Sequence, residues 1–248
     1  MSMLPRIFFL IAAVLGLSAP TSRAQTAAEP ADLVALREKL AQIDRPLMWV
    51  ITGDSITQGA KWLGRERAYP ELIQERVRWE LKRRRDFFVN SGVSGEKAAG
   101  LRADFDWRVL RFHPDLVSIM IGMNDAVAGP TGREKFETDL REMVRLVRSA
   151  GAIPVLHRTN PIDLEQTGAR SRADLAAYNE IVARVAHSTA TILIDHWAHW
   201  QAAKPAPAAL RDWLADPIHP NGTGHRQLAI EFFRTIGCYD PAAASCQP

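Results

Sequence analysis

Short apolar segments alternate with longer amphipathic segments along most of the chain. The apolar runs are four to seven residues long and several are rich in β-branched side chains, which predicts buried strands. These runs cover residues 47–52, 87–90, 116–122, 153–158 and 191–195. Because helix-length segments separate them, the order predicts an α/β fold, a parallel sheet with helices on both faces.

Helical periodicity is clearest in residues 134–150, where apolar positions recur at three- and four-residue spacing and Gly151 follows as a C-cap. Residues 25–44 contain a shorter pattern of this kind, and residues 222–236 are expected to form a C-terminal helix. The chain contains no internal repeat, low-complexity tract or interdomain linker. We therefore expect a helical lead-in (25–44), one α/β domain (45–237) and a short loose tail (238–248).

The first two dozen residues have a different character. Arg6 supplies a positive charge, residues 7–17 form an apolar core, and residues 22–24 give a small-x-small cleavage site. This arrangement is typical of a secretory signal peptide, here residues 1–24. The apolar core is too short to act as a stable membrane anchor. We expect an exported protein, either periplasmic or secreted.

Removal of the signal peptide leaves a nearly neutral chain. The full sequence has 31 Lys and Arg against 28 Asp and Glu, and residues 1–24 contain only Arg6 and Arg23 among these, so 29 cations face 28 anions. This balance gives no support for a nucleic-acid partner. The basic run at residues 82–85 is interpreted as the solvated last turn of a helix, where cations complement the helix dipole.

Both cysteines, Cys238 and Cys246, lie near the C-terminus. In an exported protein they can form a disulfide that fixes the tail, and free thiols are the alternative. His196 and His199 have a metal-like spacing, but the two adjacent tryptophans favour packing within a helix. No metal ion or other cofactor is expected.

Polar and glycine-rich segments follow three of the predicted strands: GDSIT (53–57), NSGVSG (90–95) and GMND (122–125). In open parallel sheets, ligands bind beyond the carboxyl ends of the strands. The sequence therefore predicts a site at this edge of the sheet. Within these segments we expect Asp54, Asn90, Gly92 and Asp125 to hold turns. Outside them, we expect His225 in the last predicted helix to lie on the surface.

Ser55 lies where the first strand turns into a helix. Its hydroxyl can act there as a nucleophile, with backbone N–H groups and the helix dipole available to an oxyanion. The alternative is a purely structural helix cap, because serine is a preferred N-cap residue. The motif is not the nucleophile elbow G-x-S-x-G, since Thr57 replaces the second glycine.

A nucleophilic serine requires a base, and His219 is the strongest candidate. Asp216 precedes it by three residues in DPIHPNGTGH (216–225). A carboxylate on the same loop can orient the imidazole and stabilise the imidazolium, raising its pKa. The alternative is that Asp216 only caps the turn before Pro217.

The four segments GDSIT, SGVSG, GMND and DPIH occur in this order, and the pattern resembles the SGNH hydrolase superfamily, the GDSL-type esterases, over residues 45–237. The resemblance implies a three-layer α/β/α sandwich on a five-stranded parallel sheet, as in flavodoxin-like folds. It implies Ser55 as nucleophile and His219 as general base oriented by Asp216. The implied oxyanion hole comprises the backbone N–H groups of Ser55 and Gly95 and the side-chain amide of Asn124.

Within the superfamily, the sequence looks most like bacterial carbohydrate acetylesterases. That likeness implies hydrolysis of short-chain acyl esters, acetyl foremost, on a small-molecule or polysaccharide substrate. A lysophospholipase or thioesterase acting on longer chains and an inactive carbohydrate-binding module are the alternatives. Trp62 either stacks on a sugar or belongs to the core, and His157, Arg158 and Asn160 follow the fourth strand, where they are expected to line the pocket. The oligomeric state is not predicted.

Overall fold

Five parallel strands form one sheet in the order β2-β1-β3-β4-β5 in the computed structural model, which describes residues 29–59 and 61–247. The strands are β1 (Met48–Gly53), β2 (Phe87–Asn90), β3 (Leu116–Met120), β4 (Ile153–Arg158) and β5 (Ile192–Asp195). All five predicted strands are present, within two residues at each end. The expected signal peptide lies outside the described residues.

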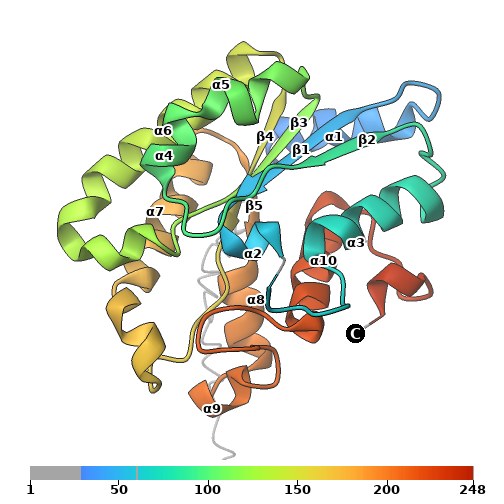
Figure 1. Cartoon of the computed structure of the whole chain (residues 1–248). Coiled ribbons are helices and arrows are strands. Elements are labelled where there is room, and N and C mark those ends of the chain that lie inside the picture. Colours follow the sequence, from blue (N-terminus) through green and yellow to red (C-terminus); the bar gives the residue numbers. More distant parts are fainter. Residues whose placement is uncertain (1–28, 60, 248) are drawn as a thin grey trace, which may run out of the picture.

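Helices cover both faces of the sheet (Figure 1). One layer contains α1 (Ala31–Ala41), α3 (Tyr69–Glu75), α8 (His196–Ala203) and α10 (Gly222–Ile236). The other layer contains α4 (Ala98–Ala103), α5 (Phe105–Arg108), α6 (Arg133–Ser149) and α7 (Leu175–Ser188). The predicted three-layer α/β/α sandwich is confirmed.

Short helical segments complete the connections. The α-helical ones are α2 (Ser55–Gln58), directly after β1, and α9 (Pro207–Leu210). The π-helix η1 (Arg76–Glu80) continues α3. The 3-10 segments are η2 (Leu110–Phe112), η3 (Asp125–Gly132), η4 (Thr167–Arg172) and η5 (Ala244–Cys246).

The strand sequences are mostly apolar because both faces of the central strands are covered. Every residue of β3 and β4 is buried. The edge strand β2 is partly exposed, and Phe87 at its start faces solvent. Burial of one large aliphatic side chain stabilises the fold by roughly 1.5–3 kcal/mol, so each apolar residue of these two strands contributes to the stability of the core.

The basic run at residues 82–85 is not the solvated last turn of a helix, as the sequence had suggested, because Arg83 is buried. Its side chain is buried, pairs with Asp86 and donates from Nη1 to the carbonyl of Leu40 at 2.8 Å and from Nη2 to that of Arg45 at 2.7 Å. The helix ends before this run, and only the three neighbours of Arg83 are exposed. Arg83 thus joins the C-terminal end of α1 to the sheet.

The C-terminal tail is docked rather than loose. The backbone N–H of Ser245 donates to Glu80 at 3.0 Å, and Arg76 donates to the carbonyl of Cys238 at 2.7 Å. Cys238 and Cys246 are free thiols in the structure, so the expected disulfide is not formed there. Burial raises the pKa of Cys238 to about 12, which disfavours its thiolate.

Candidate active site

The turn from β1 into α2 decides between the two interpretations of Ser55. The N-cap residue of α2 is Asp54, whose side chain accepts the backbone N–H of Ile56 at 3.0 Å. Ser55 is the first residue of the helix and its side chain caps nothing. Its hydroxyl is therefore available for another partner.

That partner is His219. Ser55 Oγ lies 3.0 Å from His219 Nε2, and His219 Nδ1 lies 2.8 Å from Asp216 Oδ2. The carboxylate accepts the Nδ1 proton, so Nε2 is left free to accept the proton of the hydroxyl. The structure thus brings Ser55 together with Asp216 and with His219, which lies 164 positions later in the chain.

The two carboxylate oxygens of Asp216 have different partners. Oδ1 accepts the backbone N–H groups of Ile218 at 2.8 Å and His219 at 2.7 Å, and Oδ2 accepts the imidazole. Burial acts to raise the pKa of Asp216, but these hydrogen bonds outweigh it and leave the pKa lowered. Asp216 both fixes the turn and orients the base, so the two interpretations of this residue are compatible.

The pKa of His219 is lowered from its ordinary value. Burial is the largest cause, and Arg172 and Lys61 add to it by repelling the imidazolium. Asp216 raises the pKa, as expected from the sequence, but less than burial lowers it. The net direction is therefore opposite to the expectation, and the imidazole is a neutral acceptor at neutral pH.

The three expected oxyanion-hole donors each have a hydrogen available. Among the described residues, the backbone N–H groups of Ser55 and Gly95 donate no hydrogen bond, and Asn124 Nδ2 uses one of its two hydrogens on the carbonyl of Glu96 at 3.0 Å. Gly95 has a φ of 81°, in the left-handed region that favours glycine. These three donors are the ones that the family resemblance implied.

Arg172 in η4 is a site residue that the sequence did not indicate. Its Nη2 donates to Asn124 Oδ1 at 3.0 Å, and its Nε donates to the carbonyl of Met123 at 3.2 Å. A guanidinium can only donate and a carbonyl can only accept, so Arg172 and Glu96 together define which end of the Asn124 amide is NH₂. No motif surrounds Arg172, and only the tertiary fold brings it to the site.

An ion pair supports the loop that carries Gly95. Arg108 pairs with Glu96, and its Nη2 donates to the carbonyl of Ser91 at 2.7 Å. Both ends of the 91–96 segment are thereby tied to one largely buried side chain. The sequence did not indicate these contacts of Arg108 either, because Arg108 belongs to α5 and not to any of the four motifs.

The motif neighbours hold turns, as expected. Asn90 donates to the carbonyl of Thr57 at 2.8 Å and accepts the N–H of Gly92 at 3.0 Å. Burial raises the pKa of Asp54 to about 7 and that of Asp125 to about 6. Each carboxyl has one buried oxygen, Oδ2, without a hydrogen-bond partner among the described residues.

Trp62 lies against the candidate base. Its indole stacks on the His219 imidazole with ring centroids 3.5 Å apart and planes 11° apart. Lys61 Nζ lies 5.6 Å from the same indole. Trp62 is half-buried and belongs to the site rather than to the core.

The other three predicted pocket residues are buried, and that prediction is wrong. His157 is 0% exposed, Arg158 is paired with Asp195 of the neighbouring strand, and Asn160 donates to the carbonyl of Ile218 at 3.2 Å. None of them offers a surface to a substrate. Asn160 instead braces the loop that carries Asp216 and His219.

His225 is also buried, contrary to the expectation. Its Nδ1 accepts the backbone N–H of Tyr69 at 3.1 Å, and burial lowers its pKa to about 3. It is therefore a neutral link between α10 and the start of α3. His196 is packed in the core, as expected, and the described part of the chain contains no cluster of three or more His, Cys, Asp or Glu arranged to hold a metal ion.

Comparison with known proteins identifies the family. The sequence profile of the GDSL-like lipase/acylhydrolase family matches residues 51–227, which include every residue of the site described above. The chain belongs to this family. It is a carboxylic ester hydrolase with the SGNH fold.

The chain is similar to an acetylxylan esterase from Geobacillus stearothermophilus, 31% identical over 161 residues that cover 60% of this chain and 71% of that protein. The uncharacterized lipoprotein YqeF of Bacillus subtilis (strain 168) is 28% identical over 68% of this chain and 79% of its own length. The crystal structure of the acetylxylan esterase Axe2 from G. stearothermophilus matches with a TM-score of 0.65 and 25% identity, covering 80% of this chain and 97% of that one.

Proposed function

We propose that the protein is an exported serine esterase that removes acetyl groups from carbohydrates. The observation that carries the proposal is the hydrogen-bonded series Ser55–His219–Asp216, with spacings of 3.0 Å and 2.8 Å. Each contact lies within the range required of a nucleophile, its base and the group that orients the base.

In the first half of the reaction, Ser55 Oγ attacks the ester carbonyl carbon while His219 Nε2 takes the hydroxyl proton. The carbonyl oxygen becomes an oxyanion, stabilised by the N–H groups of Ser55 and Gly95 and by the second Nδ2 hydrogen of Asn124. The tetrahedral intermediate collapses as the imidazolium returns its proton to the sugar oxygen. The sugar leaves, and the acetyl group remains on Ser55.

In the second half, His219 activates a water molecule that attacks the acetyl-enzyme. The same three donors stabilise the second oxyanion, and collapse releases acetate and restores the Ser55 hydroxyl. The neutral imidazole favoured by burial is the form that both halves require. Asp216 stays ionised throughout and stabilises the imidazolium in each half.

Similarity supports the choice of acyl group and leaving group. The G. stearothermophilus relative is named an acetylxylan esterase, and the match covers 60% of this chain and 71% of that protein. Trp62 beside His219 adds a planar apolar surface at the site, of the kind on which a sugar ring stacks. Export is supported by the signal-peptide pattern at residues 1–24 and by the lipoprotein relative.

A series of 4-nitrophenyl esters combined with acetate release from acetylated polysaccharides tests the proposal. We expect kcat/KM to fall steeply beyond acetate, and acetate to be released from at least one polysaccharide. A maximum at eight or more carbons would instead make the protein a lipase. Ser55→Ala should lower kcat by about 10⁶ with an unchanged thermal midpoint, and a folded Ser55→Ala protein with wild-type turnover would refute the assignment.

A further inference from the structure

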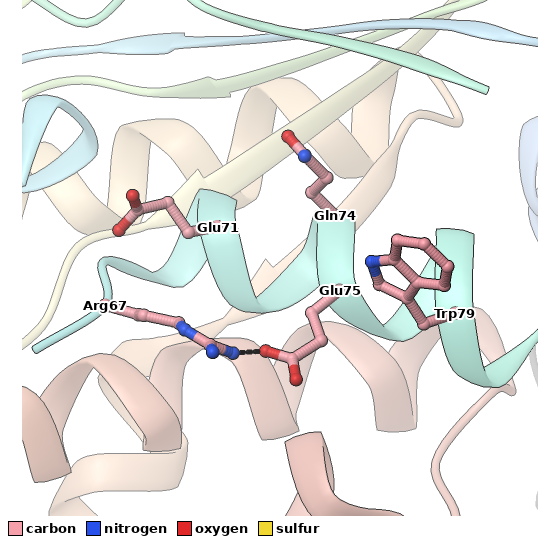
Figure 2. Close-up of a pocket in the computed structure, with 5 residues that line it drawn as sticks. All are labelled: Arg67, Glu71, Gln74, Glu75 and Trp79. Carbon is pink, nitrogen blue, oxygen red and sulfur yellow. Dashed lines mark ion pairs between the residues drawn. The ribbon is translucent and has the colours of Figure 1, made fainter. Parts of the chain in front are cut away.

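A groove of mixed polarity runs along α3 and η1. Its first part is a hollow of about 290 Å³ lined by Arg67, Glu71, Gln74, Glu75 and Trp79. Figure 2 shows these side chains on successive turns of the helix, with Arg67 reaching from the preceding segment to Glu75. A second hollow of about 460 Å³ shares Arg67 and Glu75 with the first, so the two adjoin. We call them together the α3 groove.

The α3 groove begins near the two loops that carry Trp62 and His219. Its second hollow is lined by Arg65 and Glu66, which follow Trp62 in the same loop. The Glu66 carboxylate lies against Gly222, three residues after His219. Trp79 lies ten residues beyond Tyr69, the first residue of α3, a helical rise of about 15 Å. One acetylated sugar at Ser55 cannot cover this length, whereas several linked sugars can.

The far part of the groove is marked by an exposed indole. Trp79 is 63% exposed and projects from η1, a π-helical segment of a kind that often occurs at functional positions. The Gln74 amide and the Glu75 carboxylate, which pairs with Arg67, line the groove between its two ends. The Glu71 carboxylate lies at the start of the helix, where it accepts the backbone N–H of Ala68. A flat apolar face next to planar hydrogen-bonding groups is suited to a pyranose ring, which has apolar C–H faces and hydroxyls at its edge.

The charges of the groove exclude other classes of ligand. Three arginines and three glutamates line the two hollows, which gives no net charge. A nucleic acid or an anionic lipid surface requires an excess of cations, which this groove does not have. An acyl chain requires a continuous apolar lining, and Trp79, Leu72 and Ala244 do not form one. A neutral, polyhydroxylated chain fits the lining.

We propose that the α3 groove binds the main chain of a neutral polysaccharide while an acetylated residue of the same chain occupies the site at Ser55. The inference rests on the proposed function and specifies its substrate as a polymer rather than a free acetylated sugar. Trp79 is the stacking residue furthest from the reacting bond.

The test compares Trp79→Ala with Trp107→Ala. Trp107 is a matched control because it is 67% exposed but lies on α5 in the opposite helical layer. For each variant, kcat/KM is measured on acetylated xylan and on 4-nitrophenyl acetate. We expect Trp79→Ala to lower the ratio of polymer to small-ester kcat/KM by about three- to tenfold, mainly through KM. Trp107→Ala should leave the ratio at the wild-type value.

A binding measurement separates this inference from the proposed function. The Ser55→Ala protein should be retarded in a native gel that contains de-acetylated xylan, and adding Trp79→Ala should remove most of the retardation. Equal ratios for Trp79→Ala and wild type, or equal losses for the two tryptophan variants, would overturn the groove assignment. Dissociation of an oligomer by Trp79→Ala, measured by light scattering, would overturn it too, by making the groove an interface. Failure of wild type to hydrolyse 4-nitrophenyl acetate would refute the esterase mechanism instead.

Discussion

The indole of Trp62 lies parallel to the imidazole of His219 at a centroid distance of 3.5 Å, so one face of the candidate base is closed to water. Burial is the largest cause of the lowered pKa of His219. The acid limb of kcat/KM should therefore fall below the ordinary histidine value of about 6.5.

Trp62→Ala should move that acid limb to higher pH. Removing the indole hydrates the imidazole, so its charged form becomes less costly and its pKa rises. Trp62→Phe keeps a ring over His219 and should give a smaller shift. The measurement is kcat/KM for 4-nitrophenyl acetate from pH 4.5 to 8.5 in all three proteins. Superimposable profiles for Trp62→Ala and wild type would show that the stack does not control the base.

Arg172→Gln should lower kcat by about 10² with little change in KM, since a misoriented Asn124 amide affects the transition state more than the bound ester. Measurement at pH 8 keeps His219 neutral and isolates this effect from the change in its pKa. Arg172→Lys should recover part of the loss, because its ammonium can still donate to Asn124 Oδ1.

The control for Arg172 is its neighbour Arg170, whose side chain, among the residues that the structure describes, donates only to the carbonyl of Glu165 in the same exposed segment. Arg170→Gln should retain wild-type kcat. The double variant Arg172→Gln/Asn124→Ala should be no slower than Asn124→Ala alone. In Asn124→Ala the guanidinium of Arg172 already has no amide to orient, so removing it costs nothing more. Fully additive losses would show that Arg172 acts through another group.

Asp216→Asn separates the two roles of this carboxylate. The asparagine oxygen can still accept the two backbone N–H groups, so the thermal midpoint should change little. Its NH₂ group would face Nδ1, and the imidazole would turn to the wrong tautomer for accepting the Ser55 proton. The expected loss of kcat is up to about 10⁴. A lowered midpoint with an unchanged kcat would make Asp216 a turn residue only.

Asp54→Asn should stabilise the protein at neutral and alkaline pH. The pKa of this buried carboxyl is about 7 when folded against 3.8 as its ordinary value, so its favourable contribution is complete below about 3.8 and is lost as pH rises to 7. Each pH unit in this window corresponds to about 1.4 kcal/mol. The advantage of Asp54→Asn in denaturant unfolding should grow from pH 4 to 7 and then level off. A difference independent of pH would contradict the raised pKa.

The sheet and the candidate triad were predictable because each has a local signature. Apolar runs define buried strands whatever their neighbours, and Ser55, Asp216 and His219 lie in short motifs. The ion pair of Arg158 was not predictable, because it depends on the register of the sheet. The pairing of β4 with β5 places Asp195 directly beside Arg158. Arg172 was not predictable either, since its contact with Asn124 crosses 48 positions of sequence and follows no spacing rule.

The anchoring of α1 by Arg83 determines how much of the chain is needed for expression. The family profile begins at residue 51, and a shortened gene designed from that boundary would omit α1 and the carbonyl groups of Leu40 and Arg45. Arg83 would then keep Asp86 as a partner but lose these acceptors, leaving buried donors unsatisfied. Recombinant versions should therefore start upstream of Ala31, and fusion partners are better attached there than at residue 45.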